Sequence, residues 1–211
     1  DVSEMAGLVA AEANLGFGVI CVGVAEHHEH TLFSPFVDEL LHRATIPVMI
    51  VRRARGLDRP LPPAFSRALV PVTGGRGSRA AQEVAFSLSA DLGTDLVLTH
   101  VVNRPQTSVP WPFGRSLGDD PIYAVAEGLM AESVERAEEL GVRTRTTIRE
   151  GVSTADELVT TCEQLDVDLV VLGATIRSVD GRPFLGHHVE TVLENSDATV
   201  VVVALPRVDE S

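Results

Sequence analysis

The chain has 211 residues, with 17 basic and 30 acidic side chains, so its formal net charge at pH 7 is −13. Nucleic acids and anionic membranes bind proteins through basic surfaces, so this charge argues against both as partners. A hydrophobic content of 45% is enough for a packed core and argues against disorder. No apolar run approaches the roughly 18 residues of a membrane span, and no signal-peptide pattern is recognisable.

All basic residues are arginine, so the chain lacks the lysine that Walker A loops and Schiff-base chemistry require. The cysteines, Cys21 and Cys162, lie in an apolar run and a helical stretch, which predicts buried free thiols of a reducing compartment. The chain opens on Asp1 rather than on methionine, as a processed or excised fragment would.

Residues 1–56 resemble the C-terminal part of the same chain. One constant shift makes three pairs coincide: Val2 with Val152, Leu8 with Leu158, and Gly23 with Gly173. Such self-similarity indicates a duplicated unit, of which residues 1–56 keep a helix, a strand, a helix and a strand. Two parallel strands cannot bury both faces alone. Three explanations are therefore open: the segment docks on the second unit, it pairs with another chain, or it has lost an upstream part. We favour the third, a first unit that began earlier.

Residues 57–66 are rich in proline and lack apolar periodicity, which predicts a linker. A complete unit, residues 67–211, follows. Its predicted strands cover five stretches: residues 68–72, 95–102, 143–148, 169–172 and 199–203. Four helical patterns alternate with these strands, and residues 103–118 are predicted to be a mobile surface loop. The alternation indicates an α/β fold with a parallel, doubly wound, five-stranded sheet, preceded by a partial copy of the same unit.

Two glycine-bearing loops follow buried strands of this unit. Residues 73–78, TGGRGS, lead into a helix, whose N-terminal N–H groups and dipole favour an anion, although a tight turn that needs glycine is the alternative. In residues 173–186, Gly173 and Gly186 let backbone approach a phosphate closely. Arg177 and Arg182 can neutralise its charge.

Gly173, position 176 and Gly186 reproduce the G-x-x-G-x9-G-[ST] spacing of the phosphate loop in the universal stress protein family, which this chain resembles. The chain departs from that motif with Ile176 in place of the second glycine and His187 in place of serine or threonine. The resemblance implies a Rossmann-like sheet of order 3-2-1-4-5, in which both loops meet where the strand order reverses.

The resemblance also implies an adenine nucleotide ligand, ATP, ADP or AMP, in a site that is either occupied or vestigial. The ligand contacts that it assigns are Thr73, Gly74, Val102, Gly173, Arg177, Gly186 and His187. Thr73 stands where the family usually has an aspartate near adenine and ribose, so a hydroxyl replaces a carboxylate there. We expect no catalytic residue and no resident metal ion, because no nucleophile set, acid pair or metal-ligand repeat is recognisable.

Within that family, residues 69–75 (LVPVTGG) and 78–81 (SRAA) look most like the cytosolic tandem region that follows the membrane domain of bacterial cation/proton antiporters. The function this implies is a non-enzymatic, cytoplasmic regulatory module that acts on the antiporter in cis by sensing adenine nucleotide or by dimerisation. A freestanding tandem protein that binds and slowly hydrolyses ATP, and a purely structural dimerisation domain, are the alternatives. The last strand is a predicted sheet edge, which favours a homodimer or an intramolecular pseudo-dimer.

The partial copy has Glu26 and Phe36 at the positions of the motif glycines, and between them the sequence EHHEH. His27, His28 and His30 are candidates for a transition-metal site, for a pH-responsive surface or for an inert solvated loop.

Overall fold

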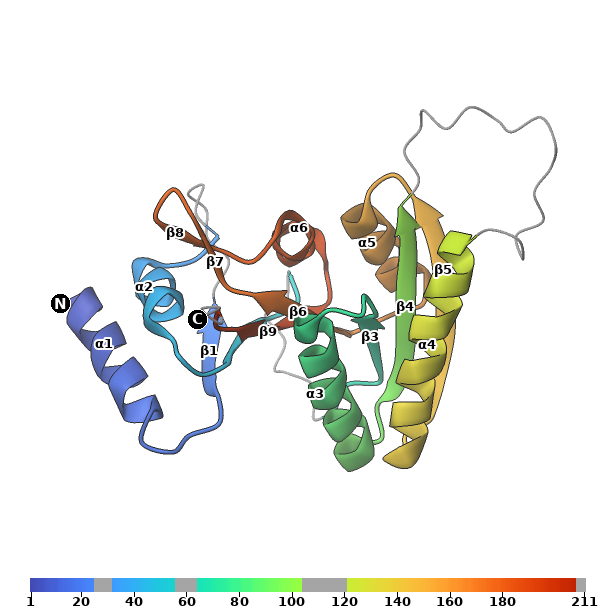
Figure 1. Cartoon of the computed structure of the whole chain (residues 1–211), viewed down its shortest axis with the longest axis horizontal. Coiled ribbons are helices and arrows are strands. Elements are labelled where there is room, and N and C mark those ends of the chain that lie inside the picture. Colours follow the sequence, from blue (N-terminus) through green and yellow to red (C-terminus); the bar gives the residue numbers. More distant parts are fainter. Residues whose placement is uncertain (25–31, 56–63, 104–120, 208–211) are drawn as a thin grey trace.

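A seven-stranded sheet of order β1-β2-β9-β6-β3-β4-β5 forms the centre of the computed structural model (Figure 1). The structure describes residues 1–24, 32–55, 64–103 and 121–207. The elements are α1 (Val2–Ala13), β1 (Ile20–Val24), α2 (Pro35–Arg43), β2 (Val48–Arg52), β3 (Arg67–Pro71), α3 (Arg76–Leu92), β4 (Asp95–Asn103), α4 (Pro121–Glu139), β5 (Thr144–Gly151), α5 (Thr154–Gln164), β6 (Leu169–Thr175), β7 (Arg177–Val179), β8 (Arg182–Phe184), α6 (His187–Asn195) and β9 (Thr199–Leu205). No helix among the described residues is both long enough and apolar enough to cross a bilayer.

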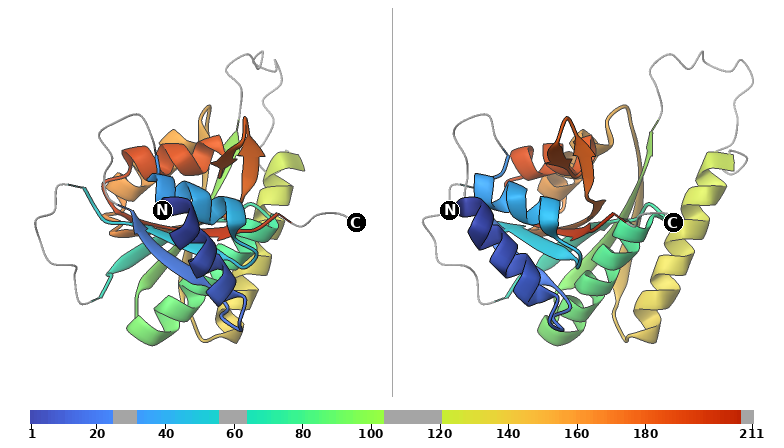
Figure 2. Two further views of the ribbon diagram at one scale, coloured as in Figure 1. Left: turned by 90° about the vertical axis from the view of Figure 1, so that its left-hand side faces the viewer. Right: turned by 60° about the vertical axis from the view of Figure 1, so that its left-hand side comes forward.

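Helices cover the sheet from both sides and enclose two hydrophobic cores. Residues of α1, α2, α5 and α6 pack with one another in the first core, whereas α3 and α4 contribute to the second, on the opposite face. Figure 2 shows α3 and α4 together on one side of the sheet and α2 and α6 on the other. Because both faces are covered, five successive residues of β9 (200–204) are all buried, as continuous apolar runs predict.

The complete unit has the predicted topology. Its strands, in the order β5-β4-β3-β6-β9, pair in parallel throughout, which is the expected order 3-2-1-4-5. Local signals set the helix ends: Ser153 caps α5 by accepting from the N–H of Asp156 at 3.3 Å, and Gly141 turns the chain after α4 with a φ of +71°. The predicted α/β fold is therefore confirmed.

The partial copy docks on the complete unit through antiparallel pairing of β2 with β9. After a slip of one residue in the repeat, residues 47–51 align with residues 198–202, so Val51 corresponds to Val202 and Ile50 to Val201. Val51 pairs with Val201 and Ile50 pairs with Val202, so the contact has approximate two-fold symmetry. Arg52 reinforces it, because its buried guanidinium donates to the carbonyl oxygens of Ser196 at 2.6 Å and Ala198 at 3.0 Å. The structure shows the first of the three cases raised for residues 1–56, docking on the complete unit, and β9 is not a free edge. The adopted case, a lost upstream part, stays a prediction.

Two further features differ from the sequence predictions. Cys21 is exposed rather than buried, because it lies on the face of β1 opposite Ile20, Val22 and Val24, which contact the first core. The second core includes no described residue of β1, so this face is uncovered. Cys162 is buried as predicted, and burial raises the pKa of its thiol to about 12. The segment after β6 holds a hairpin, β7–β8, instead of an irregular loop. The histidines at 27, 28 and 30, nearly all of the predicted mobile loop and most of the linker lie outside the described residues.

Two glycines allow α3 to touch β6 backbone to backbone. A Cβ atom added to Gly173 would lie 1.9 Å from the carbonyl oxygen of Gly77, and one added to Gly77 would lie 2.9 Å from the nitrogen of Ala174. Neither residue has a positive φ, so both glycines are required by space rather than by backbone conformation. Gly173 therefore has a packing role that the sequence prediction, a close approach of ligand, did not include.

Replacing Gly173 by alanine should lower the free energy of unfolding by about 3 kcal/mol, because overpacking against rigid backbone cannot be relieved by a side-chain rotation. Gly23 is the matched control, since it occupies the equivalent position of the partial copy and nothing lies within 4 Å of an added Cβ. Gly23→Ala should change the free energy of unfolding by less than about 0.5 kcal/mol. Urea denaturation measures both values, and equal effects would contradict the packing argument.

Candidate functional site

A cavity of about 700 Å³ opens where the carboxyl ends of β3 and β6 lie side by side. Its walls come from the loop between β3 and α3, from the end of β6, from the β7–β8 hairpin and from the first turns of α5 and α6. The strand order reverses here, since β3 pairs with β4 on one side and with β6 on the other. Crevices at such points are where open α/β sheets bind ligands.

Two helices start at this cavity without a side-chain cap. The N-caps of α3 and α6 are Gly75 and Gly186, which line the cavity. Glycine has no side chain that could accept a hydrogen bond from the first N–H groups of the helix. Glycine at both positions leaves first-turn N–H groups available to a bound group, and the two helix dipoles add positive potential. A third helix, α5, contributes its first residue, Thr154, to the same cavity.

The hairpin supplies a stacked group of side chains at the cavity. The guanidinium carbon of Arg177 lies 5.4 Å from the centre of the Phe184 ring, and that ring meets His187 edge-on with 4.9 Å between ring centres. Gly186 has a φ of +109°, and a Cβ added there would lie 3.4 Å from an Arg177 nitrogen. Glycine at 186 therefore both permits the turn into α6 and leaves space for the arginine.

The described cavity wall is positive in a chain that is acidic as a whole. Its titratable side chains are Arg76, Arg177, His187 and His188, and no aspartate or glutamate is among the described lining residues. Arginine binds carboxylate and phosphate groups with two parallel N–H donors. This arrangement therefore favours an anionic ligand with several acceptor oxygens.

Two acidic side chains, Glu190 and Asp38, interact with the elements that form the cavity wall. Glu190 accepts from the N–H of Leu185 at 3.0 Å, just before α6. Burial raises the pKa of the Glu190 carboxyl, partly offset by that hydrogen bond and by His187. Burial also raises the pKa of Asp38 on α2, partly offset by Arg182 of the hairpin, against which α2 packs. The partial copy thus supports the hairpin that carries Arg177.

Five of the seven predicted contact residues line this one cavity: Thr73, Gly173, Arg177, Gly186 and His187. Gly74 does not lie among them. Its φ is +66°, and it borders a different hollow beside Leu129. The side chain of Val102 is buried at 1% exposure, which leaves only its backbone for a ligand contact. Arg182 lies on β8 near Asp38 rather than on the cavity wall.

Ile176 does not block the cavity. Its side chain is 8% exposed and belongs to the first hydrophobic core, and its N–H donates to the carbonyl oxygen of Leu205 at 2.8 Å. It has no positive φ, so the backbone at this position does not need the left-handed conformation that favours glycine. Isoleucine is accommodated at position 176 because its hydrogen bond to Leu205 continues the pairing of β6 with β9.

Sequence reasoning missed Arg76, Phe184 and Thr154 in this cavity. Phe184 lies on the hairpin, whose turn residues Asp180 and Gly181 have φ values of +50° and +75°. An Asp-Gly pair between short extended segments is a hairpin signal, so this element was readable from sequence. Arg76 was also open to prediction, as the first residue of a helix that follows a glycine.

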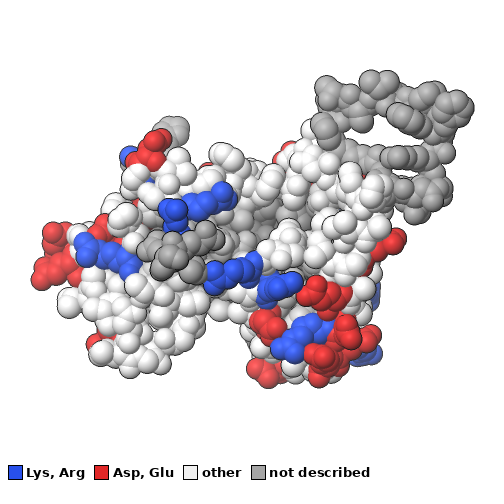
Figure 3. Space-filling view, viewed as in Figure 1, with Lys and Arg blue, Asp and Glu red and all other residues white. Residues whose placement is uncertain are grey.

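A second hollow, of about 300 Å³, lies between α3 and α4, but its charges are already paired. Arg79 bonds Glu132 at 3.2 Å, and Arg136 bonds Glu83 at 3.1 Å. Figure 3 shows red and blue atoms mixed over this region of the surface. No three histidine, cysteine or acidic side chains of the described residues are grouped to hold a metal ion.

Comparisons with known proteins point to one family. Residues 64–204 match the model of the universal stress protein family. A universal stress protein of Methanocaldococcus jannaschii is 26% identical over 144 residues, which cover 68% of this chain and 84% of that protein.

Solved structures of the family share this fold. A universal stress protein from Archaeoglobus fulgidus aligns with a TM-score of 0.64 and 21% identity over 95% of this chain and 65% of that chain. Another from the same organism, in complex with dAMP, aligns with a TM-score of 0.51 and 14% identity over 66% of this chain and 98% of that chain. A third, in complex with cAMP, has a TM-score of 0.50 and 22% identity, covering 66% of this chain and 97% of that chain.

Inorganic phosphate should stabilise the chain through this positive cavity. If its Kd is about 1 mM, about 10 mM phosphate adds about 1.4 kcal/mol to the free energy of unfolding. That corresponds to a rise in Tm of about 3–6 °C for a chain of this size. Replacing both Arg76 and Arg177 by alanine should remove most of the rise, whereas the same change at Arg79 and Arg136, outside the cavity, should keep it. A rise that survives in the first double variant would place the anion elsewhere.

Proposed function

This chain belongs to the universal stress protein family, and we propose that it binds an adenine nucleotide, ATP or AMP, in the cavity between β3 and β6. The observation that carries the proposal is the convergence of two uncapped helix N-termini and two arginines on a described wall without carboxylates. Helix N-termini and arginine together are a common phosphate site in proteins. Similar structures that hold dAMP and cAMP support an adenine ligand.

The residues divide into a phosphate end and a nucleoside end. Arg177, Gly186 and the start of α6 face the cavity from one side and suit the phosphates. Thr73, at the end of β3, is exposed and suits a ribose hydroxyl. Its N–H donates to the Ser78 hydroxyl at 3.0 Å, so a ribose contact would use the Thr73 hydroxyl, which can donate and accept.

We propose that the bound nucleotide is sensed rather than turned over. Phosphoryl transfer to water needs a group that orients the water and a metal ion that neutralises the developing charge. The described lining residues contain no carboxylate for either task, and the first loop has a hydroxyl, Thr73, where the family usually has an aspartate. Incubation of the pure chain with ATP should release no ADP above the rate in buffer. Steady release that is abolished in Arg177→Ala would favour the slow ATPase instead.

We propose further that this nucleotide sensor is the regulatory region of a cation/proton antiporter. It would lie in the cytoplasm, at the cytosolic face of the membrane. The support is the resemblance of residues 69–75 and 78–81 to that group of tandem domains. In this setting the antiporter's membrane domain is the partner in cis, and nucleotide binding or pairing of units adjusts ion exchange. Reading the gene around this segment for transmembrane helices tests the proposal at once, because a gene without them supports a freestanding tandem protein.

Calorimetric titration with AMP and ATP tests nucleotide binding directly. Arg177→Ala should weaken binding about tenfold, equivalent to about 1.4 kcal/mol, because one charge-assisted contact to phosphate is lost. Arg79→Ala is the matched control, since this arginine pairs with Glu132 outside the cavity, and should leave the Kd unchanged. Mass spectrometry of the denatured protein checks for nucleotide retained during purification. Absence of binding by both methods would leave the structural dimerisation domain as the better account.

A further inference from the structure

Two neighbouring histidines lie on the wall of the cavity between β3 and β6. His187 and His188 are the first residues of α6, and both line the cavity. Both are exposed, so a ligand in the cavity can reach them. They directly follow Gly186, which caps α6 without a side-chain hydrogen bond. The two imidazoles therefore lie in the helix turn whose N–H groups and dipole favour an anion.

His187 shares an aromatic neighbour with Arg177. The ring centres of His187 and Phe184 are 4.9 Å apart with an interplanar angle of 70°. The guanidinium carbon of Arg177 lies 5.4 Å from the centre of the same Phe184 ring. Packing on one ring holds the imidazole and the guanidinium close together, and both line the cavity. A single anion can therefore contact both groups.

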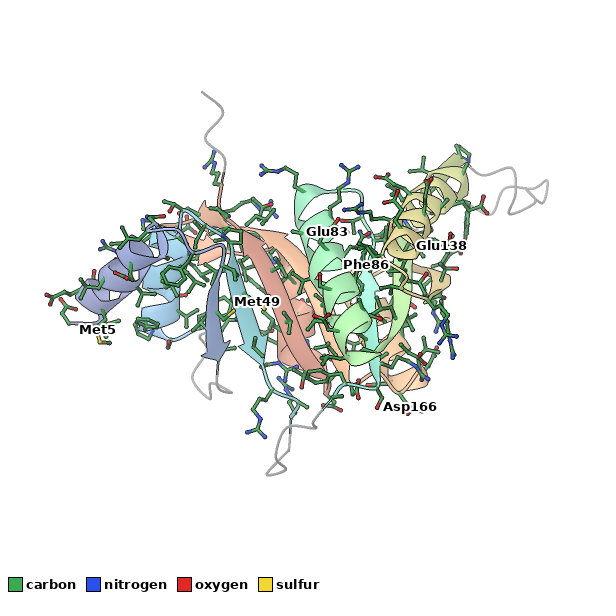
Figure 4. All side chains as sticks on the ribbon, turned by 90° about the horizontal axis from the view of Figure 1, so that it is seen from below. Met5, Met49, Glu83, Phe86, Glu138 and Asp166 are labelled. Atoms are coloured by element: carbon green, nitrogen blue, oxygen red, sulfur yellow. The ribbon has the colours of Figure 1, made fainter. Side chains whose placement is uncertain are left out.

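The other charged groups on the cavity wall are positive as well. Arg177 of β7 and Arg76 of α3 line the cavity with His187, and the lining residues that α5 contributes are uncharged. The acidic residues Glu83 on α3 and Glu138 on α4, labelled in Figure 4, border two other hollows. A proton on His187 thus adds positive charge to a wall that is already positive.

Two carboxyl groups lie near this wall without lining it. Glu190 on α6 accepts from the N–H of Leu185, and His187 lowers its pKa, although burial raises that pKa more strongly. Arg182 of β8 interacts with Asp38 of α2 rather than with the cavity. Glu190 is therefore the acidic group whose own protonation has to be separated from that of the histidines.

Protonation of these histidines and binding of an anion favour each other. In the empty cavity a proton on either imidazole meets two arginines and two helix N-termini, and like charges repel. A bound dianion reverses this effect, because a protonated imidazole donates to it from a ring N–H in a charge-assisted hydrogen bond. Histidine changes its charge between about pH 5 and pH 8. Coupling of this kind is reciprocal, so the ligand draws in protons and protons draw in the ligand.

We propose that His187 and His188 bind the anionic end of the ligand in their protonated form, so that the cavity takes up protons together with its ligand. The inference rests on the proposed nucleotide site and adds a dependence on proton concentration to it. The ligand class is a phosphate or sulfate dianion, free or as part of a nucleotide. Because imidazolium is lost as the pH rises, affinity is highest in mildly acidic solution and falls towards alkaline pH.

Titration with sulfate tests the proposal with a ligand that stays a dianion throughout this range. The Kd should be about tenfold higher at about pH 8 than at about pH 6, because the alkaline site lacks a charge-assisted hydrogen bond. The double variant His187→Gln, His188→Gln should reduce this ratio to below about twofold, since glutamine donates hydrogen bonds but carries no charge. His42→Gln is the matched control, an exposed histidine of α2 outside the cavity, and should keep the ratio.

Two further variants separate the charge of the histidines from other causes. Glu190 also gains a proton as the pH falls, which by itself would strengthen anion binding. Glu190→Gln should nevertheless keep the ratio, and its amide oxygen can still accept from the N–H of Leu185. His187→Arg places a permanent charge at the start of α6, so it should tighten sulfate binding at about pH 8 and lower the ratio.

Calorimetry with AMP at about pH 7, in buffers of different ionisation enthalpy, counts the protons taken up on binding. Because the phosphate of AMP itself titrates near about pH 6, the unmodified chain is compared with the double glutamine variant, which should take up fewer protons. Equal affinity for sulfate at both pH values, or a ratio that survives in the double variant, would overturn the inference and leave the proposed nucleotide site standing. Failure of both sulfate and AMP to bind at any pH would overturn the two together.

Discussion

The contact between Gly77 and Gly173 is the constraint on which the site depends. It joins the first turn of α3 to the end of β6 at a distance that excludes any side chain, with an added Cβ on Gly173 only 1.9 Å from the Gly77 carbonyl oxygen. These two glycines belong to loops far apart in the sequence, and their contact fixes the two loops as walls of one cavity. A motif glycine that is usually discussed for its approach to a ligand is therefore also part of the framework that shapes the ligand's space.

The sequence allowed the framework to be predicted because its signals are local. Apolar runs gave the strands, Ser153 and Gly141 marked helix ends, and the glycine loops indicated the place where the strand order reverses. The side chains of the cavity were predicted less completely. Phe184 enters through a hairpin that tertiary packing against α2 supports, and Gly74 turns towards Leu129 instead of the cavity. Such orientations depend on contacts between elements, which a pattern along the chain does not contain.

The pairing between the two units also could not be predicted from the pattern of residues along the chain. The apolar runs of β2 and β9 identify both as buried strands, but an antiparallel register that pairs Val51 with Val201 depends on how two finished units meet. The prediction for Cys21 failed for the same reason, because the apolar run that contains it indicates burial without showing which neighbours are present. Relative placement of repeats is thus the main information that the structure adds.

The symmetric pairing of β2 with β9 has an evolutionary consequence. In a homodimer related by a two-fold axis, one substitution changes both halves at once, so both phosphate loops must stay functional or decay together. Here the halves are separate stretches of one gene and are free to diverge. The loop of the partial copy has Glu26 and Phe36 at motif glycine positions, whereas Gly173 and Gly186 persist in the other. If the two halves arose by duplication, the half with Gly173 and Gly186 could keep the proposed ligand site while the other half serves as its scaffold.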